Sequence, residues 1–164
     1  MFDPEILALA ERVLDACRAR GWRVATAESC TGGLVAAALT AIAGSSDVVE
    51  RGLVTYSNKA KTELLGVPPA TLAAHGAVSA ETAAAMAEGA LARTPVALAV
   101  SITGFAGPGG GSAGKPVGLV YLGLARNGAP CRSERRIFPG DRTQIRRAAL
   151  VRALEWLDEA ARAE

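Results

Sequence analysis

The sequence predicts an α/β fold: a three-layer α/β/α sandwich with a mixed, mostly parallel sheet and a C-terminal β-hairpin. Three observations lead to this prediction. Short apolar segments alternate with helical patterns over residues 4–103, as expected of strand–helix–strand units. Residues 96–103 are almost wholly apolar, which is typical of a central strand covered on both faces. The pair Asn127-Gly128 separates two further strand patterns and predicts a hairpin.

In the N-terminal half, the expected elements are bounded by glycine, proline or small polar residues. Asp3 is expected to cap the first helix, with Pro4 at its first position and Gly21 at its end. The elements expected next are a strand at 22–27, a turn at 28–31, a helix at 32–43, a strand at 48–56 with a break at Gly52, and short helices at 59–65 and 71–75.

The C-terminal half combines one long helix, the central strand and the hairpin. Ser79 is expected to cap an alanine-rich helix that ends near Pro95, and Asp141 can cap the last helix. The other elements expected are a strand at 96–103, a glycine-rich loop at 104–114, hairpin strands at 117–124 and 131–138, and a final helix reaching residue 160. Because there is no internal repeat and no Ser- or Pro-rich linker, residues 1–164 are expected to form a single domain.

Composition limits the classes of partner. The net charge of +2 is too small to indicate a nucleic-acid or membrane partner. Cys17, Cys30 and Cys131 form an odd set without CxxC or Cys/His spacing, which argues against a disulfide framework and a structural metal site. The acidic N-terminus is not a signal peptide, and no apolar run is long enough to span a membrane. A cytoplasmic location is therefore expected.

Arginine is concentrated near the C-terminus. Seven arginines lie between residues 132 and 152, against only Glu134 and Asp141. They form either a solvated helix face and strand edge, or a group of which one or two members contact an anionic ligand. The basic residues are not interleaved with aromatic residues, so direct DNA binding is not expected.

The segment 26–33, Thr-Ala-Glu-Ser-Cys-Thr-Gly-Gly, lies where a buried strand is expected to turn into a helix. Unpaired amides at a helix start favour an anion or a developing oxyanion. Ser29, Cys30 and Thr31 are three adjacent candidate nucleophiles. Alternatively, Ser29 is only an N-cap and the glycines only permit a tight turn. The segment matches neither GxxxxGK[ST] nor GxSxG, the patterns of P-loop enzymes and of α/β-hydrolase elbows.

A second polar group, from Tyr56 to Lys61, follows the second strand. A serine nucleophile needs a base, and a tyrosine beside a lysine, or a lysine with a lowered pKa, can supply one. Alternatively, Tyr56 is an ordinary strand residue and Lys61 a solvated helix residue. His75 is the only histidine, and its place before Gly76 favours a role at a helix C-terminus over a Ser-His-Asp arrangement.

Two further segments are expected near the same sheet edge. Thr103 and Gly104 directly follow the central strand, and ligands bind outside the carboxyl ends of strands in open α/β sheets. A flexible surface loop is the alternative, above all for residues 109–114. Arg142 lies in the first turn of the last helix, where a cation opposes the helix dipole, so a phosphate or carboxylate ligand would explain its presence.

Taken in order, these segments resemble the CinA C-terminal domain family over about residues 5–160. The segments that carry the resemblance are Ala27–Gly33, Gly52–Asn58 with Lys61 and Leu64–Val67, His75–Ser79, Ser101–Gly110 and Gly140–Arg142. Several long segments in one order are far more specific than any single glycine pattern.

The resemblance implies hydrolysis of nicotinamide mononucleotide to nicotinate mononucleotide and ammonia, in the salvage of pyridine nucleotides. It also implies a serine mechanism without metal or cofactor, in a cytoplasmic homo-oligomer. The partner implied is a small nucleotide substrate, not a nucleic acid or a membrane. Longer family members carry an extra N-terminal domain linked to pyrophosphatase activity, and that activity is not expected here.

Carried onto the matching positions, Ser29 is the implied nucleophile, and Tyr56 and Lys61 would take and relay its proton. The backbone from Thr31 to Gly33 would offer hydrogen-bond donors to the oxyanion. The residues implied to bind substrate are Cys30, Thr31, Gly32, Gly33, Asn58, Thr103, Gly104 and Arg142, the last as a candidate for the phosphate. Cys30 stands where other members tolerate apolar residues.

Three other interpretations stay open. The chain could be a nucleotide-binding regulatory module of the competence/damage-inducible type, without catalysis. It could be a cysteine hydrolase that uses Cys30, since a thiolate is stabilised at a helix start. It could also hydrolyse a different amide or nucleotide, because the sequence does not reveal the shape of the pocket.

Overall fold

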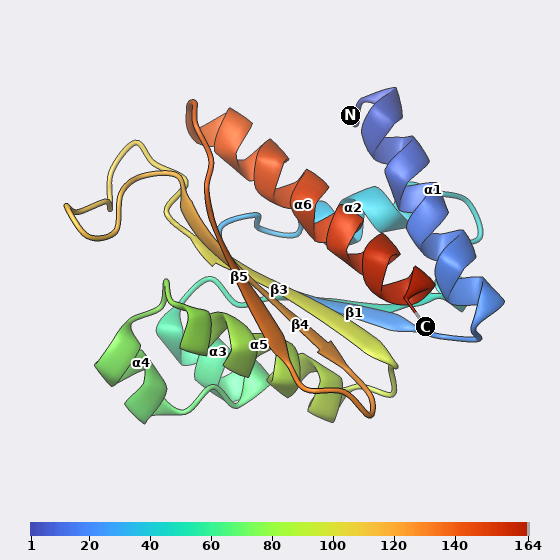
Figure 1. Cartoon of the computed structure of the whole chain (residues 1–164), viewed down its shortest axis with the longest axis horizontal. Coiled ribbons are helices and arrows are strands. Elements are labelled where there is room, and N and C mark those ends of the chain that lie inside the picture. Colours follow the sequence, from blue (N-terminus) through green and yellow to red (C-terminus); the bar gives the residue numbers. More distant parts are fainter. Residues whose placement is uncertain (164) are drawn as a thin grey trace.

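A computed structural model describes residues 1–163 and contains a five-stranded sheet with helices on both faces (Figure 1). The strand order is β2-β1-β3-β4-β5. The strands are β1 (Val24–Glu28), β2 (Val49–Val54), β3 (Leu98–Gly104), β4 (Leu119–Arg126) and β5 (Arg132–Ile137).

Only β4 runs against the direction of the other strands. β1 pairs in parallel with β2 on one side and with β3 on the other. β4 is antiparallel to both β3 and β5, so β5 runs in the same direction as β1. These pairings confirm the mixed, mostly parallel sheet and the C-terminal hairpin. The hairpin turn contains Gly128, which has a φ of 75°.

Helices α1, α2 and α6 cover one face of the sheet, and α3, α4 and α5 cover the other, which confirms the three expected layers (Figure 1). The helices are α1 (Pro4–Ala19), α2 (Leu34–Thr40), α3 (Asn58–Leu65), α4 (Pro69–His75), α5 (Ala80–Arg93) and α6 (Arg142–Arg162), with a short 3-10 helix, η1 (Ser45–Asp47), before β2.

The strands at the centre of the sheet are buried, and the edge strand β5 is exposed. Every residue of β1 is buried, and β3 is buried up to its last residue, as the apolar sequence of the central strand predicted. β5 is the opposite case, because its sequence Arg-Ser-Glu-Arg-Arg-Ile is mostly exposed. Charged side chains on an edge strand discourage pairing with another chain.

The caps expected for two helices are confirmed. Ser79 Oγ accepts a hydrogen bond from Thr82 N at 3.1 Å at the start of α5. At the start of α6, Asp141 accepts from Gln144 N at 2.9 Å, and the Gln144 side chain accepts from Asp141 N at 2.8 Å. This reciprocal capping box fixes the first turn of the helix that carries Arg142, Arg146, Arg147 and Arg152.

Two expected helix starts are corrected. Asp3 precedes α1 as expected, but its carboxylate makes no capping bond and instead pairs with Arg147 at 2.8 Å. Helix α2 begins at Leu34, two residues later than expected. Gly32 and Gly33 have positive φ values of 59° and 99°, so they belong to the turn and not to the helix.

The break expected at Gly52 is also corrected, since β2 continues through this residue. The irregularity in pairing with β1 lies earlier, at Glu50. Gly52 instead permits close packing between β2 and α2. A Cβ atom at Gly52 would lie 2.6 Å from Ala36 Cβ and 3.1 Å from Thr26 Oγ1.

This contact gives a stability prediction. Gly52→Ala is expected to lower the free energy of unfolding by about 1–3 kcal/mol, the usual cost of overpacking. Ala36→Gly removes the opposing Cβ and is expected to cost about 1 kcal/mol in helix propensity. The double variant should therefore be less destabilised than the sum of the single variants in urea denaturation. Strictly additive losses would contradict the steric explanation.

Candidate active site

Ser29 follows β1 directly, at the sheet edge where the parallel strands end. Because β2 and β3 lie on opposite sides of β1, this edge contains the point at which the strand order reverses. Ligands of open α/β sheets bind at such points. Ser29 N donates to Ile102 O of β3 at 2.9 Å, so the residue is tied to the central strand.

Lys61 of α3 contacts Ser29 directly. Its Nζ donates to Ser29 Oγ at 3.1 Å and to Thr55 O at 2.7 Å. Ser57 caps α3 by accepting from Ala60 N at 3.0 Å, and this cap fixes the helix start from which Lys61 projects. The alternative interpretation of Lys61 as a solvated helix residue is therefore wrong.

The Lys61 ammonium group lies in an environment that disfavours its charge. Lys61 is 1% exposed, and no carboxylate in residues 1–163 forms a salt bridge with it. Burial lowers the pKa of Lys61 below the ordinary lysine value. A neutral lysine amine next to a serine hydroxyl can accept its proton, so the pair has the chemistry of a nucleophile and its base.

The Glu28 carboxylate occupies the start of α2. It is fully buried and accepts from Gly33 N at 3.0 Å, Val35 N at 3.2 Å and Ala36 N at 2.9 Å, and from Thr26 Oγ1 at 3.2 Å. Its negative charge complements the helix dipole. Sequence reasoning missed this role of Glu28, although an acidic residue just before a helix start is a usable signal for it.

The Glu28 contacts change the set of amides that can stabilise an oxyanion. Gly33 N is bonded to this carboxylate, and Gly32 N donates to Ser29 O at 3.0 Å. The expectation that both glycine amides face a substrate is therefore corrected. The amides of Cys30 and Thr31 donate to no oxygen in the part of the chain that the structure describes. These two are the donors available immediately after the serine.

Cys30 packs into the apolar core between the sheet and helices α1, α2 and α6. The residue is 6% exposed, and burial raises the pKa of its thiol to about 11. A thiolate is therefore disfavoured at neutral pH, in contrast to the low-pKa thiols of cysteine hydrolases. This environment argues against Cys30 as the nucleophile and against a contact between its side chain and substrate.

Tyr56 lies apart from the Ser29–Lys61 pair in its hydrogen bonding. It is 62% exposed, and its hydroxyl accepts from Arg142 Nη2 at 3.1 Å. Arg142 Nη1 donates to Gly107 O at 2.8 Å, so the arginine joins the segment after β2 to the glycine-rich loop after β3. The expected proton relay through Tyr56 has no hydrogen bond to support it among the described residues.

Thr103 and Gly104 end β3 at the same sheet edge as Ser29, as expected. Thr103 is 1% exposed, and its hydroxyl donates to Ala77 O at 2.7 Å, which ties β3 to the segment before α5. A Cβ atom at Gly104 would lie 2.7 Å from the Val120 side chain. Both residues thus have structural reasons for their identity besides any contact with substrate.

Asn58 and His75 form no side-chain hydrogen bond with Ser29 or Lys61 among the described residues. Asn58 begins α3 and lines an exposed groove whose other lining residues are Lys59, Thr62, Glu63, Pro69 and Leu72. His75 ends α4, as expected, and its Nδ1 lies 3.6 Å from a Glu81 carboxylate oxygen. Because no hydrogen bond joins His75 to Ser29 within residues 1–163, that part of the chain forms no Ser-His-Asp arrangement.

Two threonine hydroxyls beside the pair lack hydrogen-bond partners within residues 1–163. They belong to Thr31, in the Ser29 turn, and to Thr55, whose carbonyl oxygen holds Lys61. Both residues are fully buried. Because buried polar atoms are nearly always bonded, these two hydroxyls are exceptions that lie next to the candidate site.

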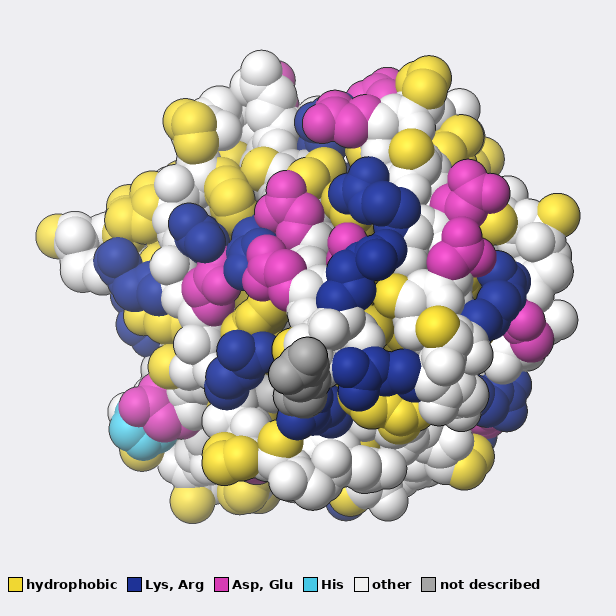
Figure 2. Space-filling model, turned by 45° about the vertical axis from the view of Figure 1, so that its right-hand side comes forward, with side chains coloured by type: hydrophobic (Ala, Val, Ile, Leu, Met, Phe, Trp, Pro, Cys, Tyr) yellow, Lys and Arg dark blue, Asp and Glu magenta, His cyan; other side chains and the backbone are white. Residues whose placement is uncertain are grey.

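The sequence left two interpretations of the C-terminal arginines: a solvated surface, or contact with an anionic ligand near the site. The structure divides the arginines between them. Arg152 pairs with Glu134 at 2.9 Å, and the hydrogen bonds of this ion pair lower the pKa of Glu134 to about 2. Positive and negative side chains are interspersed over the face in Figure 2, as in a solvated surface. Arg142 and Arg146 are different, because both donate to backbone carbonyl groups of the segments around Ser29 and β3.

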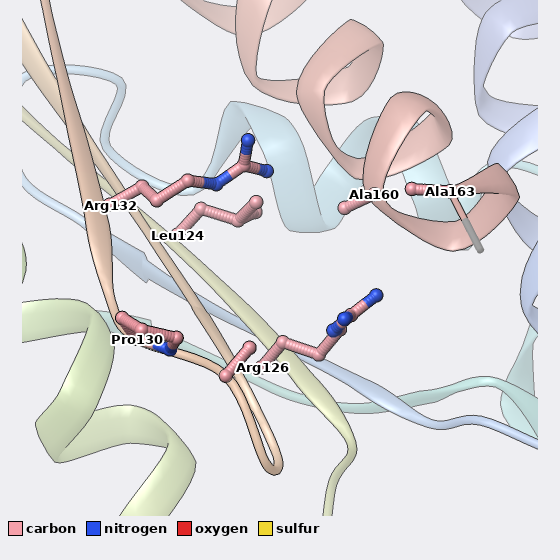
Figure 3. A pocket seen from close by; sticks show the side chains of 7 residues that line it. Leu124, Arg126, Pro130, Arg132, Ala160 and Ala163 are labelled. Carbon is pink, nitrogen blue, oxygen red and sulfur yellow. The ribbon is translucent and has the colours of Figure 1, made fainter.

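A cavity of about 260 Å³ lies between the hairpin and the C-terminal end of α6 (Figure 3). Arg126, one of its lining residues, pairs with Leu98 at the start of β3, so the cavity lies at the sheet edge opposite Ser29. Its lining includes Arg132 but no carboxylate, hydroxyl or thiol group. This cavity therefore offers no nucleophile or base.

The described residues contain neither a metal-binding cluster nor a membrane-spanning helix. No group of three or more His, Cys, Asp or Glu side chains in residues 1–163 is arranged to hold a metal ion. Within the same part of the chain, every helix is too short or too polar to cross a membrane.

Comparison with known proteins gives several extensive matches. The model of the CinA C-terminal domain matches residues 6–161. The nicotinamide-nucleotide amidohydrolase PncC of Escherichia coli K12 is 51% identical over 157 residues, which are 96% of this chain and 95% of that protein. A CinA-like protein of Geobacter sp. strain M21 is 56% identical over 140 residues, but this chain spans only 34% of its length.

A solved structure shows the same architecture. The competence/damage inducible protein CihA from Agrobacterium tumefaciens superposes with a TM-score of 0.95 at 50% identity, over 99% of each chain. The sequence segments, the observed fold and the family match agree: the chain belongs to the CinA C-terminal domain family.

Proposed function

We propose that this chain hydrolyses the carboxamide of nicotinamide mononucleotide to give nicotinate mononucleotide and ammonia. The observation that carries the proposal is the 3.1 Å contact between the buried Lys61 amine and Ser29 Oγ. The identity of 51% with the E. coli amidohydrolase, over nearly the whole of both chains, supports the choice of substrate.

The first step is attack by Ser29. Neutral Lys61 accepts the hydroxyl proton while Ser29 Oγ forms a bond to the carboxamide carbon, and the carbonyl electron pair moves onto oxygen. Thr55 O holds the amine by accepting a hydrogen bond at 2.7 Å, which leaves the nitrogen lone pair free for the serine. Desolvation favours the neutral amine that this step requires.

The oxyanion is then stabilised and collapses. The amides of Cys30 and Thr31 are the proposed donors, and one such donor is typically worth about 2.7–4 kcal/mol. Collapse breaks the C–N bond, and the proton held by Lys61 passes to the leaving nitrogen, so ammonia departs. Water then adds to the Ser29 ester, with Lys61 again taking the proton, and release of the acid restores the serine.

Arg142 is the proposed contact for the substrate phosphate. Its guanidinium bonds only to neutral groups, Gly107 O and the Tyr56 hydroxyl, so its charge is not compensated by a carboxylate among the described residues. Guanidinium groups suit phosphate because they can donate two parallel hydrogen bonds. In this proposal Tyr56 contacts substrate together with Arg142, and Thr103 and Gly104 line the pocket.

Membership of the family also suggests where this chain acts and in what form. Residues 1–164 would act as a single cytoplasmic amidohydrolase domain in a homo-oligomer, with a small nucleotide and not a nucleic acid as partner. The match to nearly the full length of the E. coli amidohydrolase supports a domain of this size.

Removal of the nucleophile is the first test. Ser29→Ala is expected to reduce ammonia release from nicotinamide mononucleotide by at least about 10⁴-fold, since loss of a serine nucleophile can cost about 10⁶-fold. Cys30→Ala keeps the backbone amide and is expected to retain most of the turnover. Full activity of Ser29→Ala would exclude the serine mechanism. Nucleotide binding without ammonia release by the wild type would favour the regulatory module.

The pH dependence tests the base. Below its pKa Lys61 is protonated and cannot accept the serine proton, so kcat/KM should rise with pH through the lowered pKa of Lys61 and then level off. Lys61→Met is expected to lower kcat by about 10²–10⁴-fold and to remove this rise. Lys59→Met, at an exposed position of the same helix, is the matched control. An unchanged pH profile in Lys61→Met would contradict the assignment.

A further inference from the structure

Arg146 connects the last helix to the Ser29 turn. Its Nε donates to Cys30 O at 3.1 Å, and its Nη2 donates to Thr31 O at 3.1 Å. The side chain is half-buried, and no carboxylate of residues 1–163 pairs with it. Its two hydrogen bonds therefore go to consecutive carbonyl groups of the turn that carries the proposed oxyanion donors.

Peptide geometry links these carbonyl groups to the amides. In a planar trans peptide, the C=O bond and the following N–H bond point in opposite directions. Because Arg146 holds Cys30 O on the α6 side, the Thr31 amide of the same peptide group faces away from α6. Ser29 O accepts from Gly32 N, which in the same way fixes the direction of the Cys30 amide.

The turn is held from a second side by Glu28. Its carboxylate binds the amides of Gly33, Val35 and Ala36, at the end of the turn and the start of α2, while Arg146 binds carbonyl groups earlier in the turn. Glu28 and Arg146, two residues of opposite charge, thus bind the two ends of one short segment. Gly32 lies beside the Arg146 guanidinium, since a Cβ atom there would lie 3.4 Å from Arg146 Nη2.

We propose that Arg146 is a positioning residue for amide hydrolysis: it orients the Cys30–Thr31 peptide so that its N–H group faces the developing oxyanion. This inference rests on the proposed function, because it assumes a Ser29 nucleophile. Arg146 itself touches no reacting atom. A planar guanidinium can hold two carbonyl groups at once, whereas a lysine ammonium is a point charge without this fork geometry.

The test compares Arg146→Ala and Arg146→Lys with Arg147→Ala. Arg147 is the neighbouring arginine, and its ion pairs lie on the surface with Asp3 and Glu5. For Arg146→Ala, kcat for ammonia release is expected to fall about 10²-fold, the scale of a misplaced catalytic group. KM is expected to change by less than about threefold, since ground-state binding is not affected. Arg147→Ala should keep the wild-type kcat.

Chemical rescue separates positioning from folding. Arg146 lines a surface cavity of about 260 Å³, so a small cation can reach its place. Added methylguanidinium is expected to restore kcat of Arg146→Ala saturably, and to leave Arg147→Ala and Arg146→Lys unchanged. Circular dichroism should show the folded state in each variant. A loss confined to KM, an equal loss in Arg147→Ala, or a failure of rescue in folded Arg146→Ala would overturn the inference.

Labelling of Ser29 by a fluorophosphonate distinguishes failure of this inference from failure of the proposed function. The probe depends on the serine and its oxyanion donors, but not on the identity of the amide. If the wild type is labelled but releases no ammonia, nicotinamide mononucleotide is not its substrate. Slower labelling of Arg146→Ala would then still support the positioning role of Arg146. Equal labelling rates in both proteins would overturn it. Absence of labelling in the wild type would overturn both.

Discussion

The constraint on which the site depends is a buried lysine amine that has no carboxylate partner within residues 1–163. Lys61 is 1% exposed, and its hydrogen bonds go to Ser29 Oγ and Thr55 O. Removing an ammonium group from water is costly, and the neutral amine avoids this cost. Burial thus lowers the pKa of Lys61 towards the neutral amine that the proposed mechanism needs as the base for Ser29.

The sheet topology brings the two members of this pair together. Ser29 leaves β1, and Lys61 follows the neighbouring strand β2 by way of a capped helix. Glu28 binds amide groups at the start of α2, just after the Ser29 turn. Arg146 of α6 binds a carbonyl group within that turn. Side chains from both halves of the chain therefore bind one short segment, which supports Ser29 although it lies in a loop.

The sequence predicted features that depend on local pattern, and it missed those that depend on contacts between distant segments. The apolar run of β3, the Asn127-Gly128 hairpin and the place of Ser29 after a strand all follow from local chemistry. The contact of Arg146 with the turn joins residues more than a hundred positions apart, and no spacing rule indicates it. The direction of the Cys30 side chain likewise depends on how the core packs.

The ionisation of Lys61 can be measured directly, because the chain has only three lysines, Lys59, Lys61 and Lys115. An NMR titration of protein labelled with isotopes at the lysine ε positions would follow each amine separately, with Lys61→Met used to assign the signals. We expect one lysine to titrate with a pKa below the ordinary lysine value, and we expect its signal to be lost in Lys61→Met. Three ordinary pKa values would contradict the account, since Lys61 would then be charged at neutral pH and unable to activate Ser29.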